Sequence, residues 1–167
     1  MILPARVLVL WTGVIFLSLR GLSFAQNGNS FITNFQLSES AIENQNWAIE
    51  QDSDGVMLFA NRRGVLSYDG VEWQLIKTTS APFCIASDTT NSKTYVGCAD
   101  NFGYLQRDEK GVYNYFSISS AYKGFGEIMQ IIIGKDYIYF YGEEALFRVS
   151  KKDNKDIKYY KCNPSET

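Results

Sequence analysis

The sequence predicts an all-β fold, a partial β-propeller of about three four-stranded antiparallel blades that follows a signal peptide. Short apolar or alternating runs are separated by tight turns rich in Gly, Asp and Asn, which is typical of strands and hairpins. Groups of four such runs recur at a period of about 40 residues, as propeller blades do. Aromatic residues make up 15% of the chain, and these residue types favour strands.

Residues 1–25 have the pattern of a secretory signal peptide. Arg6 precedes an apolar run from Val7 to Leu19, which is shorter than the roughly 20 residues that a membrane helix needs. Small residues at Ser23 and Ala25 predict cleavage before Gln26. We therefore expect an exported protein on the periplasmic side of the inner membrane. The alternative is that this segment remains as an uncleaved anchor.

Four further segments follow in order. Residues 26–45 form an N-terminal segment in which residues 31–37 can supply a ring-closing strand. The three expected blades cover residues 46–77, 83–118 and 127–161, within a propeller region that ends at residue 162. Each blade has an apolar first strand and a second strand that ends in a small residue or Asn. The third strand opens on Gly64, Gly103 or Ala145, and the fourth strand is aromatic. The alternative is an antiparallel sandwich whose hairpins merely resemble one another.

Three blades do not complete a ring, because propellers close with four to eight blades and closure removes their exposed edges. The sequence is therefore interpreted as the N-terminal fragment of a longer protein. Assembly of several copies into one ring is the competing interpretation.

Composition argues against several classes of function. The formal net charge is -2, which gives no electrostatic basis for binding nucleic acid. The chain contains no histidine, which excludes histidine metal sites and histidine-based catalysis.

Residues 52–55 resemble part of a calcium loop but lack its other ligands, so we interpret them as a hairpin turn. Glu143 and Glu144 could suggest acid/base catalysis, but neighbouring strand residues point to opposite faces and cannot act on one substrate. We therefore interpret them as part of a connection between strands. We expect no catalysis, no cofactor and no metal in this segment.

Because export is predicted, the three cysteines can form disulfides. Pairing the strands on either side of Asn91 places Cys84 and Cys98 roughly opposite each other, so a cross-strand disulfide can form between them. Two buried free thiols are the alternative. Cys162 would then be a free thiol or pair outside this chain.

A ligand-binding surface is expected where the loops that enter the first strands and join the second strands to the third meet at one end of the blades. These loops are polar and rich in amides, which suits a hydroxyl-rich or anionic ligand such as an oligosaccharide. Simple solvation of the loops is the alternative. The candidate residues are Asn44, Asn46, Asn61, Arg62, Arg63, Asp100, Asn101 and Glu143.

Several motifs carry a resemblance to a known family. They are Phe35, Asn46-Trp47-Ala48-Ile49, Asp54-Gly55-Val56-Met57, Gly64-Val65-Leu66, Tyr68-Asp69-Gly70-Val71-Glu72-Trp73, Tyr95-Val96-Gly97 and Asn101-Phe102-Gly103. Residues 31–120 thereby resemble the first two blades of the two-component regulator propeller family, whose members are extracytoplasmic sensors frequent in Bacteroidetes. The sequence departs from that family at Asn101, where an acidic residue is common.

The resemblance implies a longer protein with a periplasmic propeller, a triple-tyrosine immunoglobulin-like domain, one membrane helix and a cytoplasmic output. That output would be a histidine kinase, a LuxR-type helix-turn-helix, a cyclase or a phosphatase, and membrane attachment would come only through this downstream region. In the family pattern, Trp47 and Trp73 pack between blades. The leading hypothesis is a ligand-sensing module of a signal transduction regulator without its own catalysis. The alternative is a fragment of an exported propeller enzyme that acts on glycans.

Overall fold

The computed structural model describes residues 43–162, in which all regular structure is β-strand. Twelve strands form three four-stranded sheets, and in each sheet consecutive strands are hydrogen-bonded neighbours. The first sheet contains β1 (Asn46–Gln51), β2 (Met57–Asn61), β3 (Gly64–Tyr68) and β4 (Trp73–Ile76). The second contains β5 (Pro82–Asp88), β6 (Lys93–Cys98), β7 (Asn101–Arg107) and β8 (Tyr113–Ser117). The third contains β9 (Ile128–Ile133), β10 (Tyr137–Gly142), β11 (Ala145–Ser150) and β12 (Ile157–Lys161).

The predicted fold class, an all-β partial propeller of three antiparallel four-stranded blades, is confirmed by these sheets. The predicted signal peptide and the predicted ring-closing strand at residues 31–37 lie outside the described residues. Within residues 43–162, no helix has the length and apolar character needed to cross a membrane.

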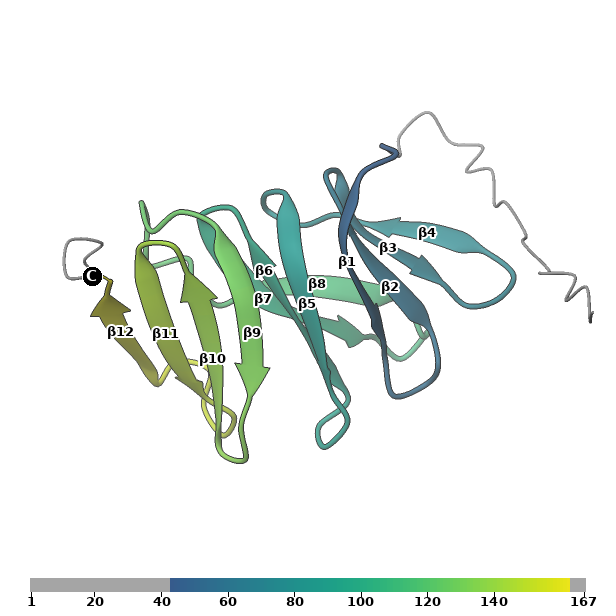
Figure 1. Ribbon diagram of the computed structural model, residues 1–167. Helices are drawn as coiled ribbons and strands as arrows, with labels where there is room; N and C mark the ends of the chain where they lie inside the picture. The colour runs from purple at the N-terminus through teal and green to yellow at the C-terminus, as the bar shows by residue number, and fades with distance from the viewer. Residues whose placement is uncertain (1–42, 163–167) are drawn as a thin grey trace, which may run out of the picture. The chain divides into compact units, whose positions relative to one another are not determined.

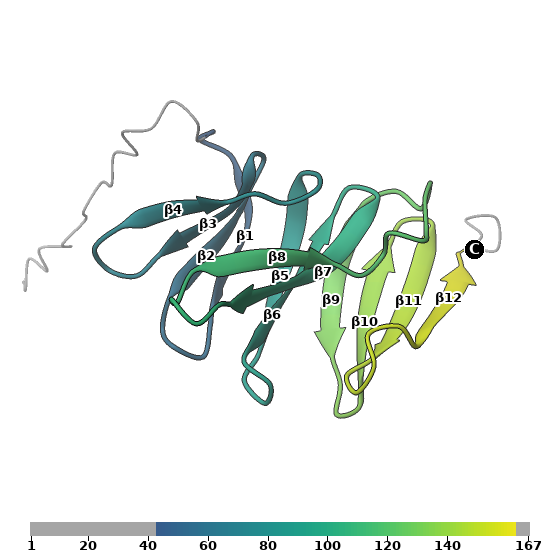
Figure 2. The same cartoon turned by 180° about the vertical axis from the view of Figure 1, so that it is seen from behind.

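The first strand of each sheet lies beside the first strand of the next. Strands β1, β5 and β9 form this inner row and run in the same direction (Figure 1). The last strands, β4 and β8, lie on the opposite side of the sheets, as the reverse view shows (Figure 2). The end at which β1, β5 and β9 begin is termed the top face, and the opposite end the bottom face. Because each sheet is an up-and-down meander, the β2–β3, β6–β7 and β10–β11 turns also lie at the top face.

Apolar side chains fill the space between the first and second sheets. Leu58, Ala60 and Val65 from the first sheet are fully buried and belong to one cluster with Ile85 and Val96 from the second. Burying one such aliphatic side chain stabilises a fold by about 1.5–3 kcal/mol. The interface therefore rests on alternate residues of each strand, which all point to the same side of their sheet.

Aromatic rings dominate the interface between the second and third sheets. The ring centroid of Phe102 lies 4.3 Å from that of Phe140 and 4.8 Å from that of Phe147. The Tyr95 ring meets Phe140 edge to face at 6.1 Å. All four side chains are fully buried. The aromatic residues noted in the sequence therefore serve the packing between sheets.

A small residue near the end of the second strand lets the next inner strand approach closely. A Cβ atom added to Gly97 would lie 2.5 Å from Ile128 Cγ2 and 2.6 Å from Cys84 Sγ. Ala60 has the same place in the first sheet, since Ala60 pairs with Ala48 as Gly97 pairs with Cys84. The third sheet has Tyr141 there, paired with Gln130 and 46% exposed.

Hydrogen bonds and ion pairs join the turns at the bottom face. Arg107 on β7 reaches back to the β1–β2 turn, where its Nη2 lies 3.2 Å from Asp52 Oδ2 and its Nη1 lies 3.1 Å from Asp54 Oδ2. Tyr113 on β8 also donates its hydroxyl hydrogen to Asp52 Oδ2. Residues 52–55 form the hairpin turn that the sequence predicts, with the Asp52 carboxylate accepting hydrogen bonds from the amides of Asp54 and Val56.

The cysteines of the second sheet are both free thiols, so the disulfide that the sequence allows is not present. A shift of register between Pro82 and Cys84 leaves Cys98 opposite Pro82 and Cys84 opposite Gly97. The two thiols also have other partners, because Cys84 Sγ donates to the Ile128 carbonyl at 3.2 Å and Cys98 Sγ lies 4.0 Å from the Tyr115 hydroxyl. Burial raises the pKa of each thiol to about 12.

We expect iodoacetamide to modify Cys162 in the folded protein while Cys84 and Cys98 stay unmodified. The thiolate is the reacting species, and the two buried groups neither ionise near pH 8 nor meet the reagent. Cys162 is partly exposed. Mass spectrometry of tryptic peptides after a short reaction checks this result, and unfolding in guanidinium should make all three react. Equal modification in the folded state would contradict the prediction.

The second sheet also differs from the predicted repeat alignment. Its third strand begins at Asn101 and not at Gly103, because Asn101 pairs with Cys98 in the way that Gly64 pairs with Asn61. Asp100 makes this tight turn possible by adopting a positive φ of 49°, a conformation that Asp tolerates better than most residues.

Candidate functional site

The top face is built from turns that are fixed by backbone hydrogen bonds. The β6–β7 turn is held between the segments that lead into β5 and β9. Ala99 donates its amide hydrogen to the Ala81 carbonyl at 2.9 Å, and Asp100 donates to the Gly126 carbonyl at 2.8 Å. The Ser80 hydroxyl donates to the Ala99 carbonyl at 2.5 Å. These bonds give the top face a defined shape between the second and third sheets.

Asn61 organises the same face at the first sheet. Its side chain is fully buried, and its Nδ2 lies within hydrogen-bond distance of the Glu43 carbonyl at 2.6 Å, the Gln45 carbonyl at 3.1 Å and Asn46 Oδ1 at 2.9 Å. Its Oδ1 accepts from the Arg63 amide at 3.2 Å. The sequence predicts direct ligand contact for Asn61, but its side-chain amide is hydrogen-bonded to the chain segment that precedes β1.

The predicted site residues nearest Asn61 have side chains that are exposed to solvent. Asn44, Asn46, Arg62 and Arg63 are exposed. The Arg62 guanidinium lies 3.6 Å from Glu43 Oε2, and the two side chains are 63% and 40% exposed. An exposed ion pair of this kind adds at most about 1 kcal/mol of stability. The pair therefore leaves Arg62 able to exchange its partner for an anionic or hydroxylated ligand.

Asp100 is partly buried and its carboxylate caps the loop before β9. Its Oδ1 accepts a hydrogen bond from the Phe125 amide at 2.8 Å. Hydrogen bonds from the amides of Gly124 and Phe125 lower the pKa of Asp100, with a smaller contribution from the charge of Lys123. Asp100 is thus a fixed negative charge that also orders the loop.

Asn101 departs from the prediction of an exposed loop residue. It lies in β7 with an exposed fraction of 3%. Its Nδ2 donates to Ser117 Oγ at 2.9 Å, and its Oδ1 accepts from the Tyr115 hydroxyl at 2.6 Å. The short turn at Asp100 draws Asn101 into the strand, so its amide satisfies buried neighbours and is not open to a ligand. Glu143, in contrast, is exposed in the β10–β11 turn.

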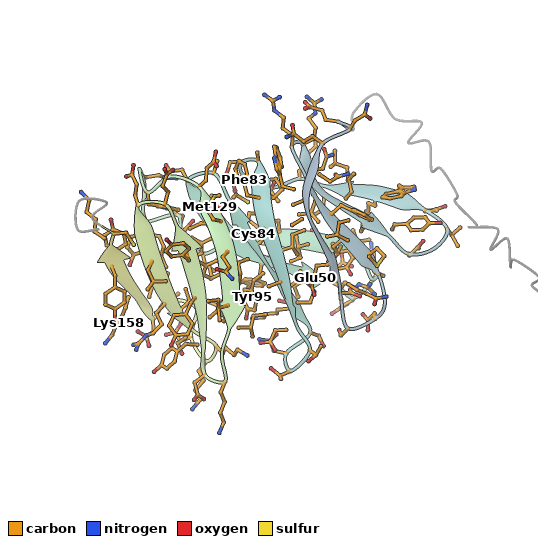
Figure 3. The ribbon with its side chains drawn as sticks, in the orientation of Figure 1. Glu50, Phe83, Cys84, Tyr95, Met129 and Lys158 are labelled. Atoms are coloured by element: carbon orange, nitrogen blue, oxygen red, sulfur yellow. The ribbon has the colours of Figure 1, made fainter. Side chains whose placement is uncertain are left out.

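A row of three large apolar side chains crosses the top of the inner strands. In every sheet the pairing of the first two strands shifts by one residue near the top face, between Asn46 and Ala48, between Pro82 and Cys84, and between Tyr141 and Gly142. The extra residues of these β-bulges are Trp47, Phe83 and Met129, termed the bulge row. Figure 3 shows Phe83 and Met129 near the tops of β5 and β9.

The bulge row is accessible to a ligand. Trp47 is 37% exposed, Met129 is 56% exposed and Phe83 is partly buried. The rings of Trp47 and Phe83 lie 4.8 Å apart at an angle of 40°. Bulges are frequent next to functional sites because they redirect a side chain out of the regular alternation. The bulge row and the polar residues of the top face therefore combine apolar rings with hydrogen-bonding groups, as small-molecule sites do.

The family resemblance predicts that Trp47 packs between blades, and no sequence pattern singles out Phe83 or Met129. The available signal is that the second residue of each inner strand is large and apolar, after Asn46, Pro82 and Ile128 respectively. Strand alternation alone cannot show that these residues are unpaired. Among the described residues, no three Cys, Asp or Glu side chains are grouped so that they could hold a metal ion.

Comparison with known proteins gives a likeness in structure only. No protein-family model and no curated protein matches the sequence. Two solved structures of the extracellular domain of BT4673 from B. thetaiotaomicron match with a TM-score of 0.58 and 16% sequence identity. One assigns that protein to the hybrid two-component systems and the other to the one-component systems. Each match covers 80% of this chain but only 17% of the matched chain, so this chain spans about a sixth of the length of the proteins it resembles. The likeness shows that the two share a fold.

Proposed function

We propose that the chain is an extracytoplasmic ligand-sensing segment of a two-component or one-component signal transduction regulator. The likeness of its fold to the extracellular domain of BT4673 supports this proposal. The export signal expected at residues 1–25 agrees with it. The role proposed for residues 43–162 is binding without catalysis, and a membrane helix and an output domain elsewhere in the protein would convert binding into a signal.

The single observation that carries the binding role is the bulge row on the top face. Three sheets present Trp47, Phe83 and Met129 at equivalent places, on the same face of the sheets as Arg62, Arg63 and the other polar turn residues. Exposed aromatic faces pack against the apolar faces of sugar rings, while amides and arginines bind hydroxyl and acidic groups. We infer that the ligand is hydroxyl-rich or anionic, with an oligosaccharide as the class that fits best.

Calorimetric titration of the intact protein with neutral and with sulfated oligosaccharides tests this proposal. We expect one of the two probe classes to bind, and Trp47→Ala to weaken that binding about tenfold or more through loss of the stacking surface. Arg62→Ala should weaken the sulfated probe more than the neutral one. The matched controls are Tyr160→Ala and Lys158→Ala, which alter exposed residues of β12 at a distance from the inner strands.

Two outcomes would overturn the proposal. One is the absence of binding by both probe classes together with an unchanged melting temperature. The other is equal loss of binding in the β12 controls and in the top-face variants.

A further inference from the structure

The outer parts of the first and second sheets line a half-open cavity on the opposite side from the inner row. Its volume is about 510 Å³, which is within the range of small-molecule sites. One wall is the β3–β4 turn and the start of β4, with Asp69, Glu72 and Trp73. The other wall is the end of β7, the β7–β8 turn and the start of β8, with Arg107, Lys110 and Tyr113. This cavity is termed the outer wedge.

The acidic wall is held in place by its own turn. Asp69 Oδ1 accepts hydrogen bonds from the amides of Val71 and Glu72, both at 2.8 Å. Hydrogen bonds from these two amides lower the pKa of Asp69, and the charge of Arg107 adds a smaller effect. Asp69 and Glu72 form no ion pair with any residue that the structure describes. The wall therefore presents two carboxylates without a bound cation.

The basic wall has one anchored and one unanchored cation. Arg107 is fixed by Asp52 and Asp54, and its Nη2 donates to the Tyr113 hydroxyl at 2.8 Å while its Nε is buried without a hydrogen-bond partner. Lys110 is exposed, and within residues 43–162 its ammonium group has no carboxylate partner. Lys110 on one wall and Asp69 and Glu72 on the other therefore line the outer wedge with no ion pair between them, whereas the charge of Arg107 is already countered by Asp52 and Asp54.

Aromatic rings supply an apolar surface between the two charged walls. Trp73 is partly buried and stacks on Tyr68 with centroids 4.6 Å apart, which fixes the position of its indole. Tyr113 is oriented by its hydrogen bonds with Arg107 and Asp52. Both rings are therefore ordered before any ligand arrives, which lowers the entropic cost of binding.

The corresponding cavity between the second and third sheets provides an internal comparison. It has a similar volume, about 490 Å³, and is also lined by aromatic residues. Only one of its lining residues, Lys155, carries a charge. The similar volumes indicate that such a cavity arises wherever two neighbouring sheets diverge toward their outer strands. Charged residues of both signs, in contrast, line only the outer wedge of these two cavities.

We propose that the outer wedge binds a zwitterion, an α-amino acid or a short peptide with free termini. The ligand's ammonium group lies against Asp69 and Glu72, and its carboxylate lies against Lys110. Its side chain packs on Trp73 and Tyr113. This site is separate from the top face and does not depend on the function proposed there.

The test is calorimetric titration of the intact protein with the dipeptide alanylphenylalanine. The matched probe is the same dipeptide with an acetylated amino end and an amidated carboxyl end, which keeps the side chains and removes both charges. We expect the free dipeptide to bind and the blocked one to bind about a hundredfold more weakly or not at all, because it loses both charged ends and each lost charged hydrogen bond weakens binding about tenfold. Failure of the free dipeptide to bind, or equal binding of both, overturns the proposal.

Variants locate the binding. Lys110→Met and Glu72→Gln alter exposed side chains and should each weaken the dipeptide about tenfold without changing the melting temperature. Lys155→Met, in the cavity between the second and third sheets, is the matched control and should leave dipeptide binding unchanged. Trp47→Ala should also leave it unchanged, which separates this site from the top face. Equal loss in Lys155→Met and Lys110→Met would place binding elsewhere and overturn the proposal.

Discussion

Gly97→Ala is expected to lower the free energy of unfolding by about 3 kcal/mol, because the added methyl group has no space between the second and third sheets. Its Cβ would lie 2.5 Å from Ile128 Cγ2 and 2.6 Å from Cys84 Sγ, well inside van der Waals contact. Both neighbours are buried, so neither side chain can swing into solvent. Urea unfolding followed by circular dichroism measures this change.

A second glycine and a second substitution serve as controls for this prediction. In Gly134→Ala the new Cβ would lie 3.1 Å from the Tyr137 carbonyl oxygen, so a smaller loss is expected. Ile128→Ala vacates space beside Gly97, and the double variant should therefore be more stable than the sum of the two single losses implies. Equal losses in Gly97→Ala and Gly134→Ala, or strict additivity with Ile128→Ala, would show that packing at Gly97 is not the cause.

Lys151→Met is expected to lower the free energy of unfolding by about 3 kcal/mol, because it leaves the buried carboxylate of Asp88 without its countercharge. Lys151 Nζ lies 2.6 Å from Asp88 Oδ2, and the side chains are only 12% and 2% exposed. The pair joins the β5–β6 hairpin of the second sheet to the third sheet at the bottom face. After the substitution, the side-chain carboxylate of Asp88 keeps the hydrogen bonds from Thr90, through its amide at 3.0 Å and its hydroxyl at 2.6 Å, but has no countercharge.

This ion pair also gives the difference in stability a defined pH dependence. Burial opposes ionisation of Asp88, but the hydrogen bonds from Lys151 and Thr90 outweigh it, and the net effect lowers the pKa of Asp88. A lowered pKa contributes stability above the unfolded value of about 3.9, and this contribution is lost as the pH falls through the folded value. The stability of the wild type and of Lys151→Met should therefore converge as the pH is lowered below about 4.

Lys152→Met is the matched control, since Lys152 is adjacent and exposed. It should change the free energy of unfolding by less than about 0.5 kcal/mol. Urea unfolding of the wild type and both variants at a series of pH values checks the prediction. A difference between Lys151→Met and the wild type that stays constant down to acidic pH would contradict it.

Much of the fold is predictable from local sequence. Alternating apolar residues and tight turns such as residues 52–55 identify the hairpins, and their recurrence identifies the three sheets. The position of the candidate site is predictable for the same reason, because a meander places its second turn beside the start of the inner strand. Exposed Arg62, Arg63 and Glu143 agree with the expectation that these loops are open to solvent.

The features that the sequence did not reveal depend on single residues or on distant contacts. One extra residue at Trp47, Phe83 or Met129 changes which face each side chain occupies, and apolar residues give no sign of such an insertion. The sequence around Asn101 is typical of a loop. The positive φ at Asp100 makes the turn short, however, and Asn101 therefore lies in β7. The pair of Asp88 and Lys151 joins hairpins of different sheets, which no local pattern encodes.

The bulges have a consequence for how such a protein can evolve. A residue outside the ladder has no partner whose register depends on it, so its replacement leaves the backbone pairing of the sheet intact. Trp47, Phe83 and Met129 differ from one another although they occupy equivalent places. Natural selection can therefore diversify chemical preference at these three positions independently, one per sheet, while the rest of the scaffold is conserved.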